Sequence, residues 1–123
     1  MMIDANSPPA GRVTIAPQVL TTIVRQTTLG TEGVQSLAAR RPPKRSRVRG
    51  RRAVEPGIEV IVSGGEVHVV LHINADPDAN MVNLARTLQK EVAYAIKHIV
   101  GMGVSGVDVF IDNVTYPNSF ATL

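Results

Sequence analysis

The chain has 123 residues, of which 44% are hydrophobic, so it is long enough for one domain with a modest core. It contains no cysteine, which excludes a disulfide framework, a Cys-based zinc site and a thiol nucleophile. No apolar run approaches the ~18–20 residues that cross a bilayer, and residues 1–10 lack the features of a signal peptide. We therefore expect a cytoplasmic protein that reaches the inner face of the cell membrane only peripherally or through a partner.

The positive charge of the chain is concentrated in one short segment. The totals are 13 basic and 10 acidic residues, a net charge of +3. Eight basic residues lie between positions 40 and 52, which leaves 5 basic and 10 acidic residues elsewhere, a net charge of −5. This distribution excludes a uniformly basic nucleic-acid-binding domain. The eight cations of this basic segment are Arg40, Arg41, Lys44, Arg45, Arg47, Arg49, Arg51 and Arg52.

The first third of the chain predicts a strand, a helix and a second strand, after a disordered leader over residues 1–10. Residues 12–16 alternate in the manner of a short strand, and Pro17 suits the first turn of a helix. Gly30 and Gly33 are expected to end the helix, and residues 34–37 predict the second strand. The apolar stripe of the helix consists of Val19, Leu20, Ile23 and Val24.

A β-hairpin is the clearest local signal. Two β-branched runs, 58–62 and 66–73, flank Ser63-Gly64-Gly65, and a primed Gly64-Gly65 turn matches the twist of such strands. That turn sets three apolar pairs on one face, which supports the register. The pairs are Val62 with Val67, Val60 with Val69, and Ile58 with Leu71.

The last part predicts a long helix over residues 80–100 and a final strand around 107–112, followed by a loose tail at 115–123. Asn80 is a candidate N-cap, and Gly101 ends the helix. The order strand, helix, strand, loop, hairpin, helix, strand predicts an α+β fold over residues 11–114, a two-layer sandwich with two helices on one face of a small mixed sheet. The buried stripe of the second helix is expected to be Met81, Ala85, Leu88, Val92, Ala95, Ile96 and Ile99.

Three motifs that suggest chemistry have simpler explanations. The G-x-G-x-x-G pattern at 101–106 closes a helix rather than opening one, so it does not present a helix N-terminus to a nucleotide. His68 and His72 lie roughly 13 Å apart along one strand, too far to share a metal ion. No nucleophile, base and oxyanion donor assemble in the sequence. We therefore expect no enzyme, cofactor, metal or small-molecule substrate.

Two surfaces are candidates for partner binding. The hairpin register puts Ile61, His68, Val70 and His72 opposite the core, and Phe110 takes the same side of the last strand. Such an apolar patch favours self-association or a partner site, although scattered exposed aliphatic residues are the alternative. The basic segment lies in residues 40–57, which we expect to form a flexible loop. It could bind nucleic acid, bind anionic lipid or an acidic partner, or remain solvated.

The ordered parts together resemble the alkaline-shock and general-stress family of bacterial envelope stress response proteins. The resemblance is carried by Gly11-Arg12-Val13-Thr14-Ile15-Ala16-Pro17, Glu32-Gly33-Val34, Gly57-Ile58-Glu59-Val60, Gly64-Gly65-Glu66-Val67, the helix from Asn80 and Val107-Asp108-Val109. It implies a non-enzymatic, self-associating cytoplasmic scaffold or adaptor, with a membrane-anchored protein as a possible partner. The alternative function is a nucleic-acid-binding module that uses residues 40–52.

Overall fold

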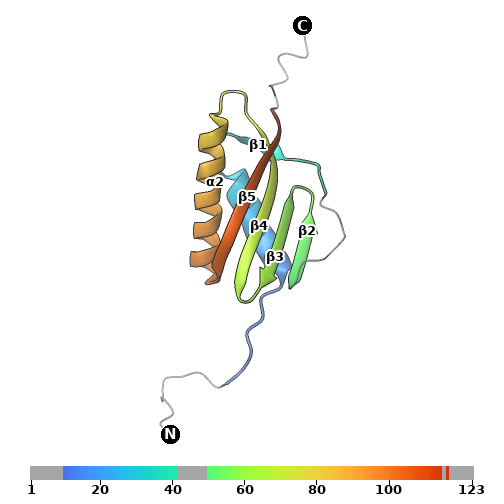
Figure 1. The fold of residues 1–123 in the computed structure, drawn as a ribbon, viewed down its shortest axis with the longest axis vertical. Coiled ribbons are helices and arrows are strands. Elements are labelled where there is room, and N and C mark those ends of the chain that lie inside the picture. The colour runs from blue at the N-terminus through green and yellow to red at the C-terminus, as the bar shows by residue number, and fades with distance from the viewer. Residues whose placement is uncertain (1–9, 42–49, 115, 117–123) are drawn as a thin grey trace.

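The computed structural model describes residues 10–41, 50–114 and 116 of the chain. Figure 1 shows the arrangement of its helices and strands. In chain order the elements are α1 (Pro17–Leu29), β1 (Val34–Leu37), β2 (Arg51–Glu55), β3 (Ile58–Ser63), β4 (Glu66–Ala75), α2 (Met81–Ala95), the π-helical turn η1 (Ile96–Val100) and β5 (Gly103–Val114).

The five strands form one mixed sheet with β4 at its centre. β4 pairs antiparallel with β1 and β3 and parallel with β5, while β2 pairs antiparallel with the other side of β3. α1 packs against β2 and β3, and α2 packs against β5 and α1. In Figure 1 the strands lie in front of α1, so the viewer faces the side of the sheet away from that helix. The predicted two-layer α+β class and the mixed sheet are confirmed.

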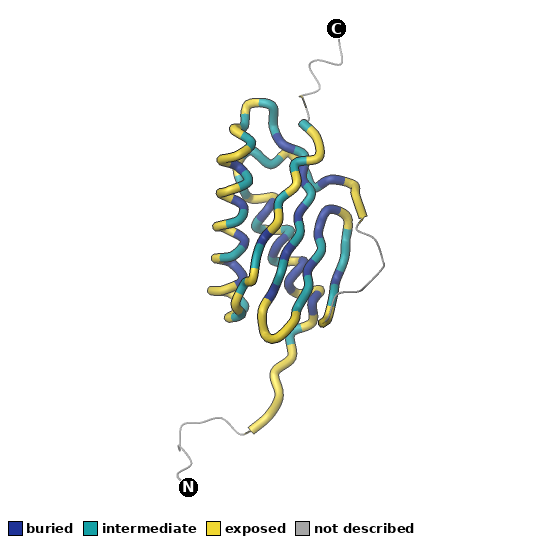
Figure 2. Tube along the Cα trace, viewed as in Figure 1, coloured by how far each residue is buried: buried dark blue, intermediate teal, exposed yellow. Residues whose placement is uncertain are grey.

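The core lies between the sheet and the helices. Side chains along β4 alternate between buried and half-buried, as expected for a strand with one covered face (Figure 2). The hairpin register is confirmed, because Ile58 pairs with Leu71, Val60 with Val69 and Val62 with Val67. The fully buried side chains include Leu20, Val24, Ile58, Val60, Val67, Val69, Leu71, Ile73, Leu88, Val92 and Ile96.

The helices begin where the sequence predicts, but their buried faces differ in detail. Pro17 opens α1, and the Asn80 side chain accepts a hydrogen bond from the backbone N–H of Asn83 at 3.0 Å. Val19 is 48% exposed and Ile99 is 70% exposed, so these two core assignments were wrong. Ile99 lies in η1, whose wider i→i+5 turns carry it off the buried stripe. Leu84 is buried in the core, although the predicted buried stripe of this helix did not include it.

Residues 12–16 form no strand, contrary to the prediction. They are assigned to neither helix nor strand, and Val13 is 90% exposed. The alternation of the residues was read correctly, but a strand also needs a neighbour for its backbone groups. The segment leaves the domain at the end where α1 begins (Figure 1), and no described strand pairs with it.

The predicted loop over residues 40–57 was also partly wrong. Arg51–Glu55 form the edge strand β2, in which Ala53 is buried opposite Val60. Arg51 and Arg52 therefore belong to a strand that pairs with β3, which the charge pattern alone did not indicate. The last strand is longer than predicted as well, because β5 runs beside β4 over Gly103–Val114. Residues 42–49 lie outside the described part, as do most of the predicted leader and tail.

Candidate functional site

One face of the sheet is left uncovered by α1 and α2, and we call it the open face. Strand alternation and register place its side chains, because Ile61 lies opposite His68 and His72 lies opposite Phe110. All five residues of the predicted patch, Ile61, His68, Val70, His72 and Phe110, therefore lie together on this face. The open face comprises Arg52 and Val54 of β2, Glu59 and Ile61 of β3, His68, Val70 and His72 of β4, and Asp108, Phe110 and Asp112 of β5.

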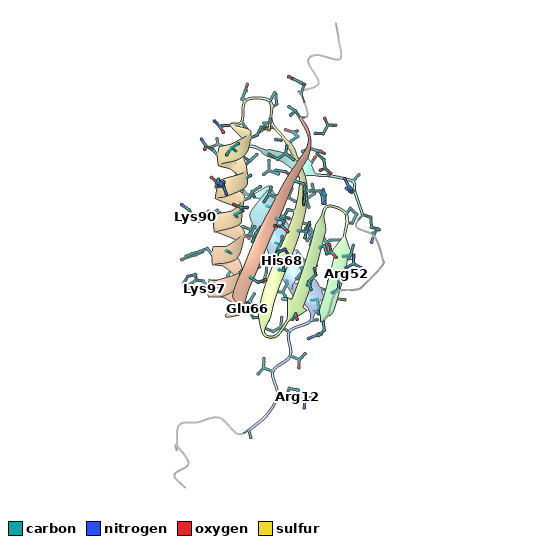
Figure 3. All side chains as sticks on the ribbon, viewed as in Figure 1. Arg12, Arg52, Glu66, His68, Lys90 and Lys97 are labelled. Carbon is teal, nitrogen blue, oxygen red and sulfur yellow. The ribbon has the colours of Figure 1, made fainter. Side chains whose placement is uncertain are left out.

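Polar side chains on the open face are held in cross-strand pairs. His68 Nε2 lies 2.9 Å from Asp108 Oδ2, and His72 Nδ1 lies 3.1 Å from Asp112 Oδ2. Arg52 of β2 forms an ion pair with Glu59 of β3, and their side chains are only 14% and 15% exposed. Figure 3 shows His68 and Arg52 on neighbouring parts of this face. Each charged group thus has a partner supplied by the domain itself.

Phe110 is the largest apolar side chain on the open face. It remains 49% exposed, although its ring stacks on His72 with 4.8 Å between ring centroids and 12° between planes. The stack and the His72–Asp112 contact hold this ring in one orientation. Ile61 and Val70 are half-buried on the same face. The face therefore presents a fixed aromatic ring and aliphatic groups among paired polar groups.

Ser105, His68 and Asp108 lie in a line that superficially resembles a catalytic triad. The Oγ atom of Ser105 is 3.5 Å from His68 Nδ1 and also 3.4 Å from the carbonyl oxygen of Val67. These distances are at the outer limit of hydrogen bonding. Ser105 is exposed on the edge strand β5, whereas acyl transfer needs a nucleophile and oxyanion donors held in a site that excludes water. Val67 pairs with Val104 and His68 pairs with Gly106, so Ser105 is an extra residue in β5 at this point. This bulge explains why Ser105 lies beside His68.

The described cations of the basic segment divide into two groups. Arg40, Arg41 and Arg51 are exposed, whereas Arg52 is engaged with Glu59 within the sheet. The other four, Lys44, Arg45, Arg47 and Arg49, lie outside the described residues.

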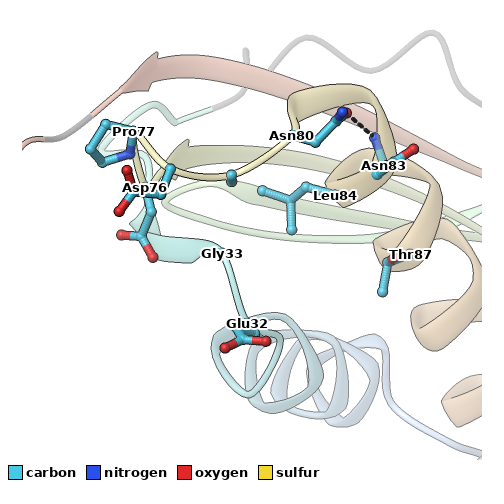
Figure 4. A pocket seen from close by; sticks show the side chains of 10 residues that line it. Glu32, Gly33, Asp76, Pro77, Asn80, Asn83, Leu84 and Thr87 are labelled. Carbon is cyan, nitrogen blue, oxygen red and sulfur yellow. Dashed lines mark hydrogen bonds between the residues drawn. The ribbon is translucent and has the colours of Figure 1, made fainter.

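A pocket of about 640 Å³ lies between the end of α1 and the start of α2 (Figure 4). Glu32, Asp76 and Asp78 line it together with Asn80. Negative charge is stabilised near a helix N-terminus, which explains Asp76 and Asp78 just before α2. In the described part of the chain, no three His, Cys, Asp or Glu residues are grouped in a way that could hold a metal ion.

The two His–Asp pairs were not predicted from the sequence. A signal was present, because His68 and His72 are four residues apart and so are Asp108 and Asp112. Equal spacing on two strands of the same face allows two cross-strand pairs only if the strands are neighbours in the right register. The parallel pairing of β4 with β5 meets that condition.

Comparison with known proteins identifies the family. The sequence profile of the alkaline shock protein 23 family, described as having a cell envelope-related function, matches residues 5–116. The chain belongs to this family, which confirms the resemblance found in the sequence. No curated protein sequence matches the chain.

One solved structure is similar in outline. It is the zinc form of a variant of the MamM CTD, with 11% sequence identity and a TM-score of 0.45 over 84% of this chain and 88% of that chain. Within residues 10–41, 50–114 and 116, no helix is both long enough and apolar enough to span a membrane.

Proposed function

We propose that this protein is a non-catalytic, self-associating scaffold or adaptor in a cell envelope-related process, and that copies meet through the open face. The observation that carries the proposal is Phe110, a half-exposed aromatic ring of the edge strand β5 that stacks on His72 of the central strand β4, on the sheet face that α1 and α2 leave uncovered. Aromatic residues in fixed orientations are the usual energetic centres of protein interfaces.

The paired polar groups make the open face suitable for burial. Covering an unpaired charge is expensive, whereas a charge that already has a hydrogen-bonded partner loses less on leaving water. Arg52 has Glu59, His68 has Asp108 and His72 has Asp112. A second copy can therefore cover Ile61, Val70 and Phe110 without leaving these polar groups unsatisfied.

Val70→Lys tests this interface. Val70 lies between Glu59 of β3 and Asp108 of β5, so a lysine there gains acidic neighbours and the fold is expected to persist. The new charge would lie in the centre of the contact between copies. We expect the concentration at which assembly is half complete, measured by light scattering, to rise at least tenfold, about 1.4 kcal/mol.

The matched control is Val19→Lys, because Val19 is 48% exposed on α1, on the other side of the molecule. It is expected to leave assembly unchanged. Equal assembly by wild type and Val70→Lys would contradict the assignment of the open face, and a monomeric wild type at all concentrations would contradict the scaffold itself.

The basic segment is proposed as a separate contact with an anionic partner at the inner face of the cell membrane, either anionic lipid or an acidic region of a membrane-anchored protein. Arg40, Arg41 and Arg51 support this because they are exposed, and because they belong to a basic segment in a chain whose other residues carry a net charge of −5. Charge on such a segment attracts anionic surfaces at about 1 kcal/mol per basic residue.

The test replaces seven of the eight cations by glutamine and keeps Arg52, because Arg52 pairs with Glu59 in the fold. We expect co-sedimentation with phosphatidylglycerol-containing vesicles to be lost at physiological salt. Lys90 and Lys97, two exposed cations of the α2–η1 helix (Figure 3), provide a control in which K90Q/K97Q binds vesicles like wild type. Unchanged vesicle binding by the seven-site variant, or tighter binding of wild type to duplex DNA than to vesicles, would favour the rival readings.

A further inference from the structure

A short segment before α1 has the composition of a strand but no strand to pair with. Residues 12–15 contain three consecutive β-branched residues, Val13, Thr14 and Ile15, which favour extended structure. Val13 is 90% exposed, so almost all of its apolar side chain is in contact with solvent. We call residues 12–15 the donor segment.

The outer edge of β5 has the complementary property. This strand has 12 residues and pairs with β4 on one side, and no described strand pairs with its other side. The carbonyl oxygen of Val107 accepts a hydrogen bond from Gln89 Nε2 of α2 at 3.1 Å, so it faces the outer edge rather than β4. Backbone groups alternate in direction along a strand, so those of Val109 and Ile111 face the same edge. Gln89 occupies the edge at Val107, so the part without a described strand partner begins at Val109. Unpaired strand edges are sites at which a further strand can add.

A groove runs beside this edge, between α2 and β5. Its volume is about 280 Å³, and most of its lining is apolar. Val109 and Ile111 supply the strand side. The helix side consists of Met81, Val82 and Ala85, together with the polar residues Arg86 and Gln89. A strand added to β5 would place every second side chain in this groove and the others on the open face.

We propose that the donor segment of one copy adds as a strand to the outer edge of β5 in a second copy. Val13 and Ile15 have the two-residue spacing of Val109 and Ile111, so they would enter the groove together. Arg12 and Thr14 would then lie on the open-face side, where β5 carries Asp108 and Asp112. The apolar side chains of Val13 and Ile15 would thus contact the mostly apolar groove, and Arg12 would lie near the two aspartates of β5.

The geometry requires a second copy. The donor segment leaves the domain beside the start of α1, with Arg12 labelled in Figure 3, whereas the groove lies at the opposite end, where α2 begins (Figure 1). Donor and acceptor sites at opposite ends of one molecule produce a head-to-tail contact, which repeats into an open chain. The edge of β2 is a poorer acceptor, because it has only 5 residues and exposed Arg51 would repel Arg12.

This inference deepens the proposed self-association but uses a different surface, so the two can fail separately. The donor variant V13D/I15D puts two charges into a groove whose lining is mostly apolar. Because Ile15 is half-buried in its own domain, circular dichroism is used to establish that this variant is folded. The acceptor variant V82D/A85E changes the first turns of α2, where acidic residues suit the helix N-terminus. V13I/I15V keeps the β-branched character and is the matched control.

The experiment uses full-length chains carrying Val70→Lys, in which strand addition is the remaining contact, and measures mass by sedimentation velocity. We expect V70K alone and with V13I/I15V to form a concentration-dependent series of oligomers, and both donor and acceptor variants to be monomeric. An equal mixture of donor and acceptor variants should give a one-to-one complex, because one intact donor meets one intact acceptor. Oligomers that persist in the donor variant, or a mixture that stays monomeric, would overturn strand addition whatever V70K itself shows.

Discussion

Replacing Leu71 by alanine is expected to destabilise the domain by about 3 to 5 kcal/mol. Leu71 is fully buried in the central strand β4, between Ile58 of β3 and Val109 of β5, and packs in the main core cluster. The substitution removes buried methyl groups and leaves a cavity that a strand held on both sides cannot close. Since small domains have total stabilities of about 5–15 kcal/mol, this one change would remove a large part.

Urea denaturation followed by circular dichroism measures this effect, with the slope of the transition compared between variants. Val82→Ala is the control, because Val82 is 65% exposed on α2 and alanine has the higher helix propensity. We expect the control to change stability by less than about 0.5 kcal/mol. A similar small loss for Leu71→Ala would show that β4 is not central to the core.

Gly57→Ala is expected to destabilise the domain by roughly 2 to 5 kcal/mol, the sum of backbone strain and overpacking. Gly57 has a φ of +81°, a conformation that residues with a side chain rarely adopt. A Cβ atom there would lie 2.9 Å from the carbonyl oxygen of Ala38 and 3.0 Å from that of His72. The N–H group of Gly57 donates a hydrogen bond to the carbonyl oxygen of Arg40, and its carbonyl oxygen accepts one from the N–H group of His72. The strain therefore falls where β1, β3 and β4 meet.

Gly64→Ala separates the two contributions. Gly64 has a φ of +61°, but a Cβ atom there would meet nothing within 4 Å. Only backbone strain applies, and we expect a loss of about 1 to 2 kcal/mol. Thermal unfolding of both variants gives the comparison, and equal losses would mean that the crowding around Gly57 has no energetic effect.

Local signals in the sequence predicted much of the fold correctly. The Gly64-Gly65 turn and the alternation on either side of it determine the β3–β4 register without help from the rest of the chain. Asn80 likewise caps α2 through a contact three residues away. Such features depend on neighbours in sequence, so a single sequence suffices to find them.

The remaining features depend on contacts between distant residues. β2 forms beside β3, where Ala53 pairs with Val60 and Arg52 forms an ion pair with Glu59. The number of charges over residues 40–52 does not predict these contacts. The open face was predicted as a set of residues, but its His–Asp pairs require the parallel neighbour β5. The strand predicted over residues 12–16 was wrong for the single chain, and a partner for residues 12–15 is what the proposed strand addition would supply.

Methyl NMR spectra recorded over a dilution series test whether copies meet through the open face. Ile61 and Val70 lie on the open face, whereas Val60 and Val69 of the same two strands are fully buried on the helix side and act as internal controls. We predict concentration-dependent shifts for the methyl groups of Ile61 and Val70, with those of Val60 and Val69 unchanged. Open-face methyl signals that stay constant from dilute to concentrated samples would contradict the account.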